Sequence, residues 1–183
     1  MKSPALDVAR ATPWFRLPRP THRLGELLAH ASNAIAGGVR DDAVSALAMA
    51  IELAPRDVDL RLRYAVLLAE QGRTLEAQDA FIAVLDFEPS NLDALVSLAE
   101  LCRAAGHRVG AVDLLSHART FHGDHPDILA ALAHLAIDLE DRDGAMRLLV
   151  HLQGRRADHS EAEVLIRRLA ELRSRERLAE LGL

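Results

Sequence analysis

Small and large apolar residues recur along the chain with a period of 34 residues. Two rows of alanine keep this spacing, and a large apolar residue stands four positions after each alanine of the second row. A period of this length is typical of a helix-turn-helix unit, and alanine indicates helices that approach closely. The first row is Ala31, Ala65, Ala99 and Ala133, the second is Ala43, Ala77, Ala111 and Ala145, and the large residues are Leu47, Phe81, Leu115 and Leu149.

Within each period the apolar residues follow the spacing of two amphipathic helices. In the second period, Leu60, Tyr64 and Leu67 lie on one helical face. A short break and a second amphipathic segment follow, such as residues 74–87, and short breaks place two helices antiparallel. The breaks contain Gly37 and Gly38, Gly72 or Gly106, and the second helices of the first two periods end at Pro55 and Pro89.

Candidate capping residues stand where the helices are expected to begin. Asp57 and Asn91 precede the first helix of the second and third periods. Pro126 suits the first turn of the next helix, where its missing N–H costs little. Ser160 and Glu163 form an S-x-x-E capping box that opens the last helix. The capping residues therefore agree with the periodic division.

The 34-residue phase divides the chain into a tail, four units and a final helix. The tail, residues 1–23, is rich in proline and is expected to be extended or disordered. Arg167 stands where all four units have alanine, so no further helix is expected to pack closely there. The last segment is then a capping helix, as the end of a repeat array requires. The units are 24–57, 58–91, 92–125 and 126–159, and the capping helix is 160–183.

This pattern resembles the tetratricopeptide repeat (TPR) family. The resemblance covers residues 24–159 and implies an all-α fold, a right-handed α-solenoid of four TPR helix pairs with a C-terminal capping helix. The fourth unit departs from the family pattern, since Glu140 replaces the turn glycine and Ala157 replaces the proline. The second unit matches the pattern most closely, through Tyr64, Ala65, Leu68, Gly72, Ala77, Phe81, Val84 and Pro89.

Composition supports helices and narrows the class of function. Only 3% of the residues are aromatic, so the core must be built mainly from Ala, Leu, Val and Ile, which favours helices over a sheet. A net charge of −5 argues against general nucleic-acid binding. With one cysteine and no apolar run long enough to cross a membrane, we expect a cytoplasmic protein. The excess of arginine over lysine indicates a GC-rich, bacterial genome.

No enzyme motif is present, so we expect a non-catalytic protein without a cofactor or a metal. The sequence lacks glycine-rich nucleotide loops, paired metal-binding histidines of the H-E-x-x-H type and nucleophile elbows. Cys102 lies at an interior helix position and is expected to act as a small hydrophobe. His134 and Asp138 share a helix face, as a pH-sensitive pair or as surface residues. Whether the cluster of His117, His122 and His125 binds a metal is left open.

The resemblance implies a concave groove that is lined by the first helix of each unit. At the positions that line the groove in the family, this sequence has a strip of apolar residues, which includes Ala130, and acidic residues stand around the strip. Such a groove suits an extended or helical peptide with apolar anchors and Arg or Lys, although acidic residues near helix starts also complement the helix dipole. The expected groove residues are Leu28, Asp59, Leu62, Arg63, Val66, Glu70, Asp93, Val96, Glu100, Arg103, Asp127, His134 and Asp138.

The tail is the second candidate for binding. Trp14 and Phe15 lie beside Arg16 and Arg19, in a segment with basic residues and one acid on an otherwise acidic chain. A disordered leader explains this composition, and so does docking of the aromatic pair on an apolar surface of this chain, of a second copy or of another protein. Homo-oligomerisation through the tail or through the C-terminal helix stays open.

These observations favour a protein-protein interaction module, a TPR adaptor or scaffold that binds a peptide or protein partner. The alternative is a dedicated chaperone or assembly factor for a bacterial secretion or envelope system. RNA binding by a related helical repeat is disfavoured by the acidic chain. Some TPR domains grip a C-terminal carboxylate, but here those positions hold Ser32, Asp59, Val66, Asp93 and Ser97, so no such clamp is expected.

Overall fold

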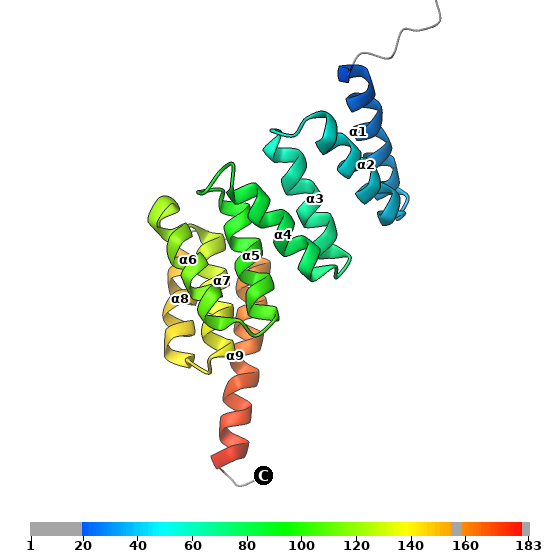
Figure 1. The fold of residues 1–183 in the computed structure, drawn as a ribbon. Helices are drawn as coiled ribbons and strands as arrows, with labels where there is room; N and C mark the ends of the chain where they lie inside the picture. Colours follow the sequence, from blue (N-terminus) through cyan, green and yellow to red (C-terminus); the bar gives the residue numbers. More distant parts are fainter. Residues whose placement is uncertain (1–19, 155–158, 181–183) are drawn as a thin grey trace, which may run out of the picture. The chain divides into compact units, whose positions relative to one another are not determined.

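The structure is a computed structural model that describes residues 20–154 and 159–180, and these residues form nine α-helices and no strand (Figure 1). The chain divides into two compact units, one up to Pro55 and one from Arg56. The all-α fold that the sequence predicts is confirmed.

The first unit is an antiparallel pair of helices, α1 (Pro20–Ala36) and α2 (Arg40–Leu53), which pack against each other. Ala31 and Ala34 of α1 are buried, as are Ala43 and Leu47 of α2. Helix α1 begins at Pro20, so the helix already starts within the segment that was expected to be tail. Proline is well tolerated in the first turn of a helix, which explains why it does not delay the start.

The second unit is an array of helix pairs closed by a single helix. Each pair is antiparallel, and the first helix of each pair also packs against the first helix of the next, so that α3, α5, α7 and α9 form one layer and α4, α6 and α8 the other (Figure 1). The helices are α3 (Val58–Glu70), α4 (Thr74–Leu85), α5 (Leu92–Ala104), α6 (Arg108–His122), α7 (Pro126–Asp138), α8 (Arg142–Gly154) and α9 (His159–Glu180).

The alanines of both rows lie in the core, and none of the eight is more than 2% exposed. Phe81, four positions after Ala77, is also completely buried. A methyl group at these positions allows the backbones of neighbouring helices to approach, whereas a larger side chain would force them apart. The alanine rows therefore serve packing, as the sequence predicts.

The turn inside each helix pair has the same backbone conformation in all four pairs. Gly38, Gly72 and Gly106 have φ of 75°, 73° and 81°, and Glu140 at the equivalent position has φ of 60°. In the fourth pair the N–H of Glu140 donates to the carbonyl of Ile137 and that of Asp141 to Ala136, the same two hydrogen bonds that close the other turns. The missing glycine therefore does not change the turn, although this backbone region disfavours residues with a Cβ.

The predicted caps of α3, α5 and α7 are present. The Asp57 carboxylate accepts a hydrogen bond from the N–H of Leu60 at 3.2 Å, and the Asn91 side chain accepts one from Ala94 at 3.0 Å. Pro126 occupies the first turn of α7, as expected. The capping box expected at the start of the last helix is wrong in its position, because α9 begins at His159 and Ser160 therefore stands inside the first turn and not at the N-cap.

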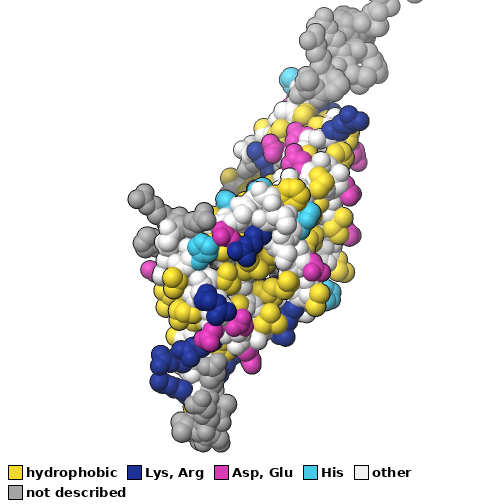
Figure 2. Space-filling view, turned by 90° about the vertical axis from the view of Figure 1, so that its left-hand side faces the viewer, with side chains coloured by type: hydrophobic (Ala, Val, Ile, Leu, Met, Phe, Trp, Pro, Cys, Tyr) yellow, Lys and Arg dark blue, Asp and Glu magenta, His cyan; other side chains and the backbone are white. Residues whose placement is uncertain are grey.

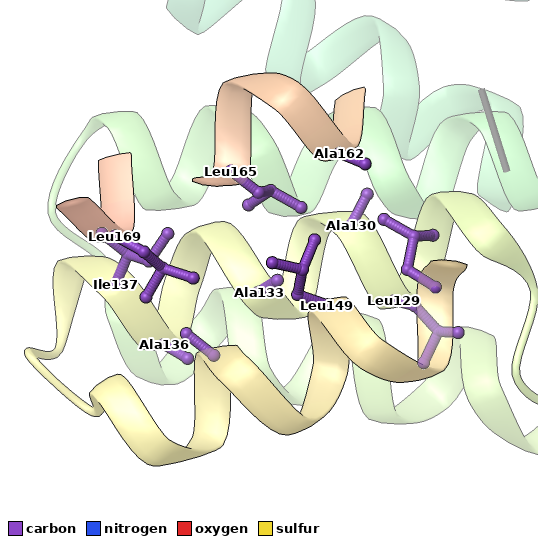
Figure 3. Close-up of a cluster of buried hydrophobic side chains, with 11 residues drawn as sticks. Leu129, Ala130, Ala133, Ala136, Ile137, Leu149, Ala162, Leu165 and Leu169 are labelled. Carbon is purple, nitrogen blue, oxygen red and sulfur yellow. The ribbon is translucent and has the colours of Figure 1, made fainter. Parts of the chain in front are cut away.

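Helix α9 covers the end of the array. Its buried Ala162, Leu165 and Leu169 pack into a cluster with residues of α7 and α8 (Figure 3). Arg167 is exposed on α9, as its charge requires. Leu178, farther along the helix, is 49% exposed. Helix α9 therefore caps the fourth unit with the part up to Leu172, which is also buried, and Leu181 lies outside the described residues.

Candidate partner-binding groove

The groove residues that the sequence predicts lie on the layer made by α3, α5 and α7, and we call these side chains the groove face. Most of them are at least partly open to solvent. Leu28 lies on α1 and belongs to the first unit, so it is not part of the groove face of the second unit. The groove face consists of Asp59, Leu62, Arg63, Val66 and Glu70 on α3, Asp93, Val96, Glu100 and Arg103 on α5, and Asp127, His134 and Asp138 on α7.

One residue of the expected apolar strip is not on the surface. Ala130 is buried in the cluster that α7 and α8 share with α9, close to Ala162 (Figure 3). Helix α9 covers it because the C-terminal helix packs on α7 in the same layer. The expectation that Ala130 forms part of an open floor is therefore wrong. Val66, by contrast, is 38% exposed on α3.

A chain of charged side chains crosses three helices of this layer. Arg103 of α5 is 2.7 Å from the Glu100 carboxylate on the same helix and 2.6 Å from Asp138 on α7. Arg168 of α9 donates to the other Asp138 oxygen at 2.5 Å and to Nδ1 of His134 at 2.5 Å. Asp138 thus lies between two guanidinium groups. The pairing of His134 with Asp138 that the sequence suggested is mediated by Arg168, which contacts both.

The pKa values reflect this arrangement. Burial alone would raise the pKa of Asp138, but the hydrogen bonds and charges of Arg103 and Arg168 outweigh it and lower this pKa below its ordinary value. Burial alone would likewise lower the pKa of Arg103, but its bonds to Asp138 and Glu100 raise it. Each group therefore stays charged and holds its neighbours in place. The charged chain is a fixed part of the groove face.

A hollow of about 520 Å³ opens beside this charged chain. It lies where the ends of α5 and α7 and the start of α6 meet the middle of α9. Four arginines and three acidic residues are among its lining groups. The charged residues that line the hollow are Arg103, Arg108, Arg168, Arg175, Asp138, Glu140 and Glu171.

Arg168 and Arg175 are contributed by α9, which the repeat pattern predicts only as a capping helix. The signal that locates Arg168 is present in the sequence, because Arg168 stands 34 residues after His134, the same spacing that relates the units. Extending the repeat by one more first helix would have added it to the groove face. Helix α9 therefore combines capping with a contribution to the candidate site.

The histidine cluster binds a loop of the chain itself. Nε2 of His122 is 2.5 Å from the carbonyl oxygen of Ser90, and Nε2 of His117 is 3.3 Å from that of Pro89. Nδ1 of His125 accepts from the N–H of Asp127 at the start of α7. In the part of the chain that the structure describes, no three His, Cys, Asp or Glu side chains are grouped so as to hold a metal ion.

The remaining candidates offer no clear site. Cys102 is half-buried against the core of α5, α6 and α7, and burial raises the pKa of its thiol, so the nucleophilic thiolate is disfavoured. Trp14, Phe15, Arg16 and Arg19 lie outside the described residues. Among the described helices, none is long and apolar enough to cross a membrane.

The comparisons with known proteins concern the fold. No model of a known protein family matches the sequence, and no curated protein matches it. The structure is similar to a tetratricopeptide repeat protein from Parabacteroides merdae, with a TM-score of 0.69 and 18% identity over 88% of this chain and 68% of that chain. It is also similar to a thermophilic TPR protein from Thermus thermophilus, with a TM-score of 0.65 and 18% identity over 84% of this chain and 82% of that chain.

A third similar structure is an O-GlcNAc transferase mutant from Thermobaculum terrenum. Its TM-score is 0.63 and its identity 19%, over 75% of this chain and 27% of that chain. At this identity the likeness shows the fold alone, and a fold does not decide whether a protein is catalytic. The TPR fold that the sequence predicts is confirmed.

Proposed function

We propose that this protein is a non-catalytic adaptor that binds a peptide or protein segment along the groove face. The observation that carries the proposal is the groove face itself, a row of accessible apolar and charged side chains on helices whose backbones are locked by buried alanines. The TPR fold supports a protein-interaction scaffold in general. A rigid, preformed surface lowers the entropic cost of binding an extended partner.

The α3 end of the groove face favours a basic and apolar segment. Val66 is exposed there, with Leu62 half-buried on the same helix. Asp59, Glu70 and Asp93 are exposed, and none of the three forms an ion pair within residues 20–154 and 159–180. Their charges are therefore available to a partner's Arg or Lys, while the apolar residues receive a Leu, Phe or Trp anchor.

A competing surface exists on the opposite layer of the second unit. Hydrophobic side chains are scattered among charged ones on the face that α6 and α8 present in Figure 2. Val109 and Val112 of α6 and Met146 and Val150 of α8 are exposed there. Singly exposed aliphatic residues are common on protein surfaces, so this face provides the matched control for the groove.

The test is affinity purification from the native host with three forms of the full chain: unchanged, Val66→Glu and Val150→Glu. Both valines are exposed helical residues, at 38% and 63%, so either carboxylate reaches water without disturbing the core. We expect Val66→Glu to remove the partner found by mass spectrometry and Val150→Glu to keep it. If the partner is lost only with Val150→Glu, the binding site lies on α6 and α8. If both variants retain the partner, it does not bind at Val66.

The same experiment separates the alternative functions. One stoichiometric client encoded beside this protein would favour a dedicated chaperone or assembly factor over a general adaptor. RNA recovered in a salt-sensitive manner would contradict the proposal. We also infer a bacterial, cytoplasmic protein, as the single cysteine and the arginine-rich composition suggest.

A truncated chain tests whether the tail takes part in binding. Residues 1–19 lie outside the described residues and contain Trp14 and Phe15, so removing them leaves the described helices whole. If the tail docks on the groove face or on a partner, the shortened chain should differ in partner affinity or in oligomeric state. An unchanged partner and an unchanged mass would reject the tail as a binding element.

A further inference from the structure

The charges that line the hollow differ from those at the α3 end of the groove face. Arg103 and Arg168 are held by Asp138, which fixes the positions of both guanidinium groups while leaving them 22% and 29% exposed. Because each guanidinium group has five N–H donors, both arginines keep N–H groups that these bonds do not use. Two ordered arginines therefore remain able to donate to a further acceptor.

Two more arginines stand in the lining of the same hollow. Arg108 in the first turn of α6 and Arg175 on α9 are exposed, and neither takes part in an ion pair within the described helices. Their side chains are long enough to close over a group in the hollow, and their charges are not neutralised by this chain. The lining as a whole holds four cations and three anions.

We infer that the hollow between α5, α7 and α9 receives a single carboxylate, the side chain of an Asp or Glu of the partner segment. The net lining charge of one positive unit matches one carboxylate. Glu140 and Glu171, which also line the hollow without an ion pair in the described chain, would repel a phosphate dianion. Guanidinium groups suit a carboxylate, since their N–H pairs match its two oxygens.

This inference rests on the proposed function and adds to it the orientation in which the partner segment binds. The acidic residues at the α3 end attract the basic part of a bound segment, and the hollow at the α9 end attracts an acidic residue. A segment with a basic residue toward one end and an acidic residue toward the other therefore binds in one orientation. The reversed segment would place like charges together at both ends.

The test begins with random peptides displayed on phage and selected on the immobilised full chain. We expect the selected peptides to share an acidic residue at a fixed distance from a basic or large apolar one. The selection is repeated on the double variant Arg108→Gln with Arg175→Gln, which should lose the preference for the acidic residue. The control is Arg147→Gln with Arg167→Gln, which makes the same charge change at exposed arginines outside the hollow lining.

A selected peptide is then synthesised with an amidated C-terminus, together with an analogue whose acidic residue is replaced by its amide. The double variant should bind the acidic peptide roughly 3- to 30-fold more weakly and the amide analogue with unchanged affinity. Glu171→Gln should strengthen binding of the acidic peptide. A free-acid peptide that binds tighter than the amidated one at the hollow would assign the site to a chain terminus and overturn the side-chain assignment.

The outcomes distinguish this inference from the proposed function. Peptides that bind the groove face but share no acidic residue would contradict the carboxylate site in the hollow. They would still support the adaptor proposal. An equal loss of affinity for the acidic peptide and its analogue would do the same, because it would show an indirect effect of the arginines. If neither the unchanged chain nor the double variant selects any peptide, both the adaptor proposal and the carboxylate site are contradicted.

Discussion

At the scale of single residues, Glu140 is the position where sequence and backbone conflict. Its φ of 60° falls in the region where Gly38, Gly72 and Gly106 stand in the other turns. In this region the Cβ of an L-residue crowds the backbone, at a cost of about 1 kcal/mol or more. The surrounding hydrogen bonds hold the turn in place, so the strain is carried by the folded state.

Replacing Glu140 by glycine should therefore stabilise the protein. We expect a gain of about 0.5–1 kcal/mol in the free energy of unfolding, because relief of strain exceeds the added freedom of the unfolded chain. Urea denaturation followed by circular dichroism measures it. The reverse change, Gly106→Ala, should destabilise by a similar amount, although a Cβ there would meet no other atom within 4 Å. Equal stability of all three proteins would show that the turn is not strained.

At the scale of helices, α9 is the element that closes the core of the second unit. Leu165 is completely buried between α7 and α8, whereas Leu178 on the same helix is 49% exposed. Leu165→Ala should lower the free energy of unfolding by about 2–5 kcal/mol, because it removes buried methyl groups and leaves a cavity. Leu178→Ala is the matched control and should change it by less than about 0.5 kcal/mol. Similar losses in both variants would mean that the far half of α9 is also covered.

The charged chain across α5, α7 and α9 predicts a dependence of stability on pH. Since the folded-state pKa of Asp138 is lowered, its ionisation stabilises the fold at pH values above the unfolded-state pKa of about 3.9. That contribution is lost as the pH falls through the folded-state value. Asp138→Asn should be less stable than the unchanged protein at neutral pH, by at most about 1 kcal/mol, and this difference should shrink in acid.

Denaturation at neutral pH and at about pH 3 measures that difference. The exposed Asp79 on α4 supplies the control, because Asp79→Asn removes the same charge away from the arginines. A difference between Asp138→Asn and the unchanged protein that stays constant with pH would show that the loss comes from shape or hydrogen bonding and not from ionisation.

At the scale of the whole molecule, the spacing of the alanines predicts the helix pairs and their order, because close packing tolerates only a methyl group at those positions. The site is less predictable. Repeat position places Arg103 and Asp138 on the groove face, but their pairing depends on how neighbouring helices align their side chains. Ala130 shows the same limit, since its burial is decided by α9, which follows a whole further helix later in the chain.

Association of whole chains through the end of α9 stays a prediction from the sequence. If the exposed leucine side of this end, including Leu178, pairs with a second copy, a chain that ends at Arg173 should have a lower mass in light scattering than the full chain. The cut spares Leu165, Leu169 and Leu172, so the cap on α7 and α8 is kept. Equal numbers of chains per particle in both proteins would rule out pairing through this segment.

The way in which α9 packs has a consequence for the evolution of the array. Helix α9 contacts α7 and α8 as α7 contacts α5 and α6, so the cap sits on a surface that every helix pair of this kind presents. A duplicated block of 34 residues inserted before residue 160 would meet a suitable neighbour on both sides. The array can therefore grow by internal duplication without redesign of its terminus, and each added block would lengthen the binding face while the sealing helix is inherited unchanged.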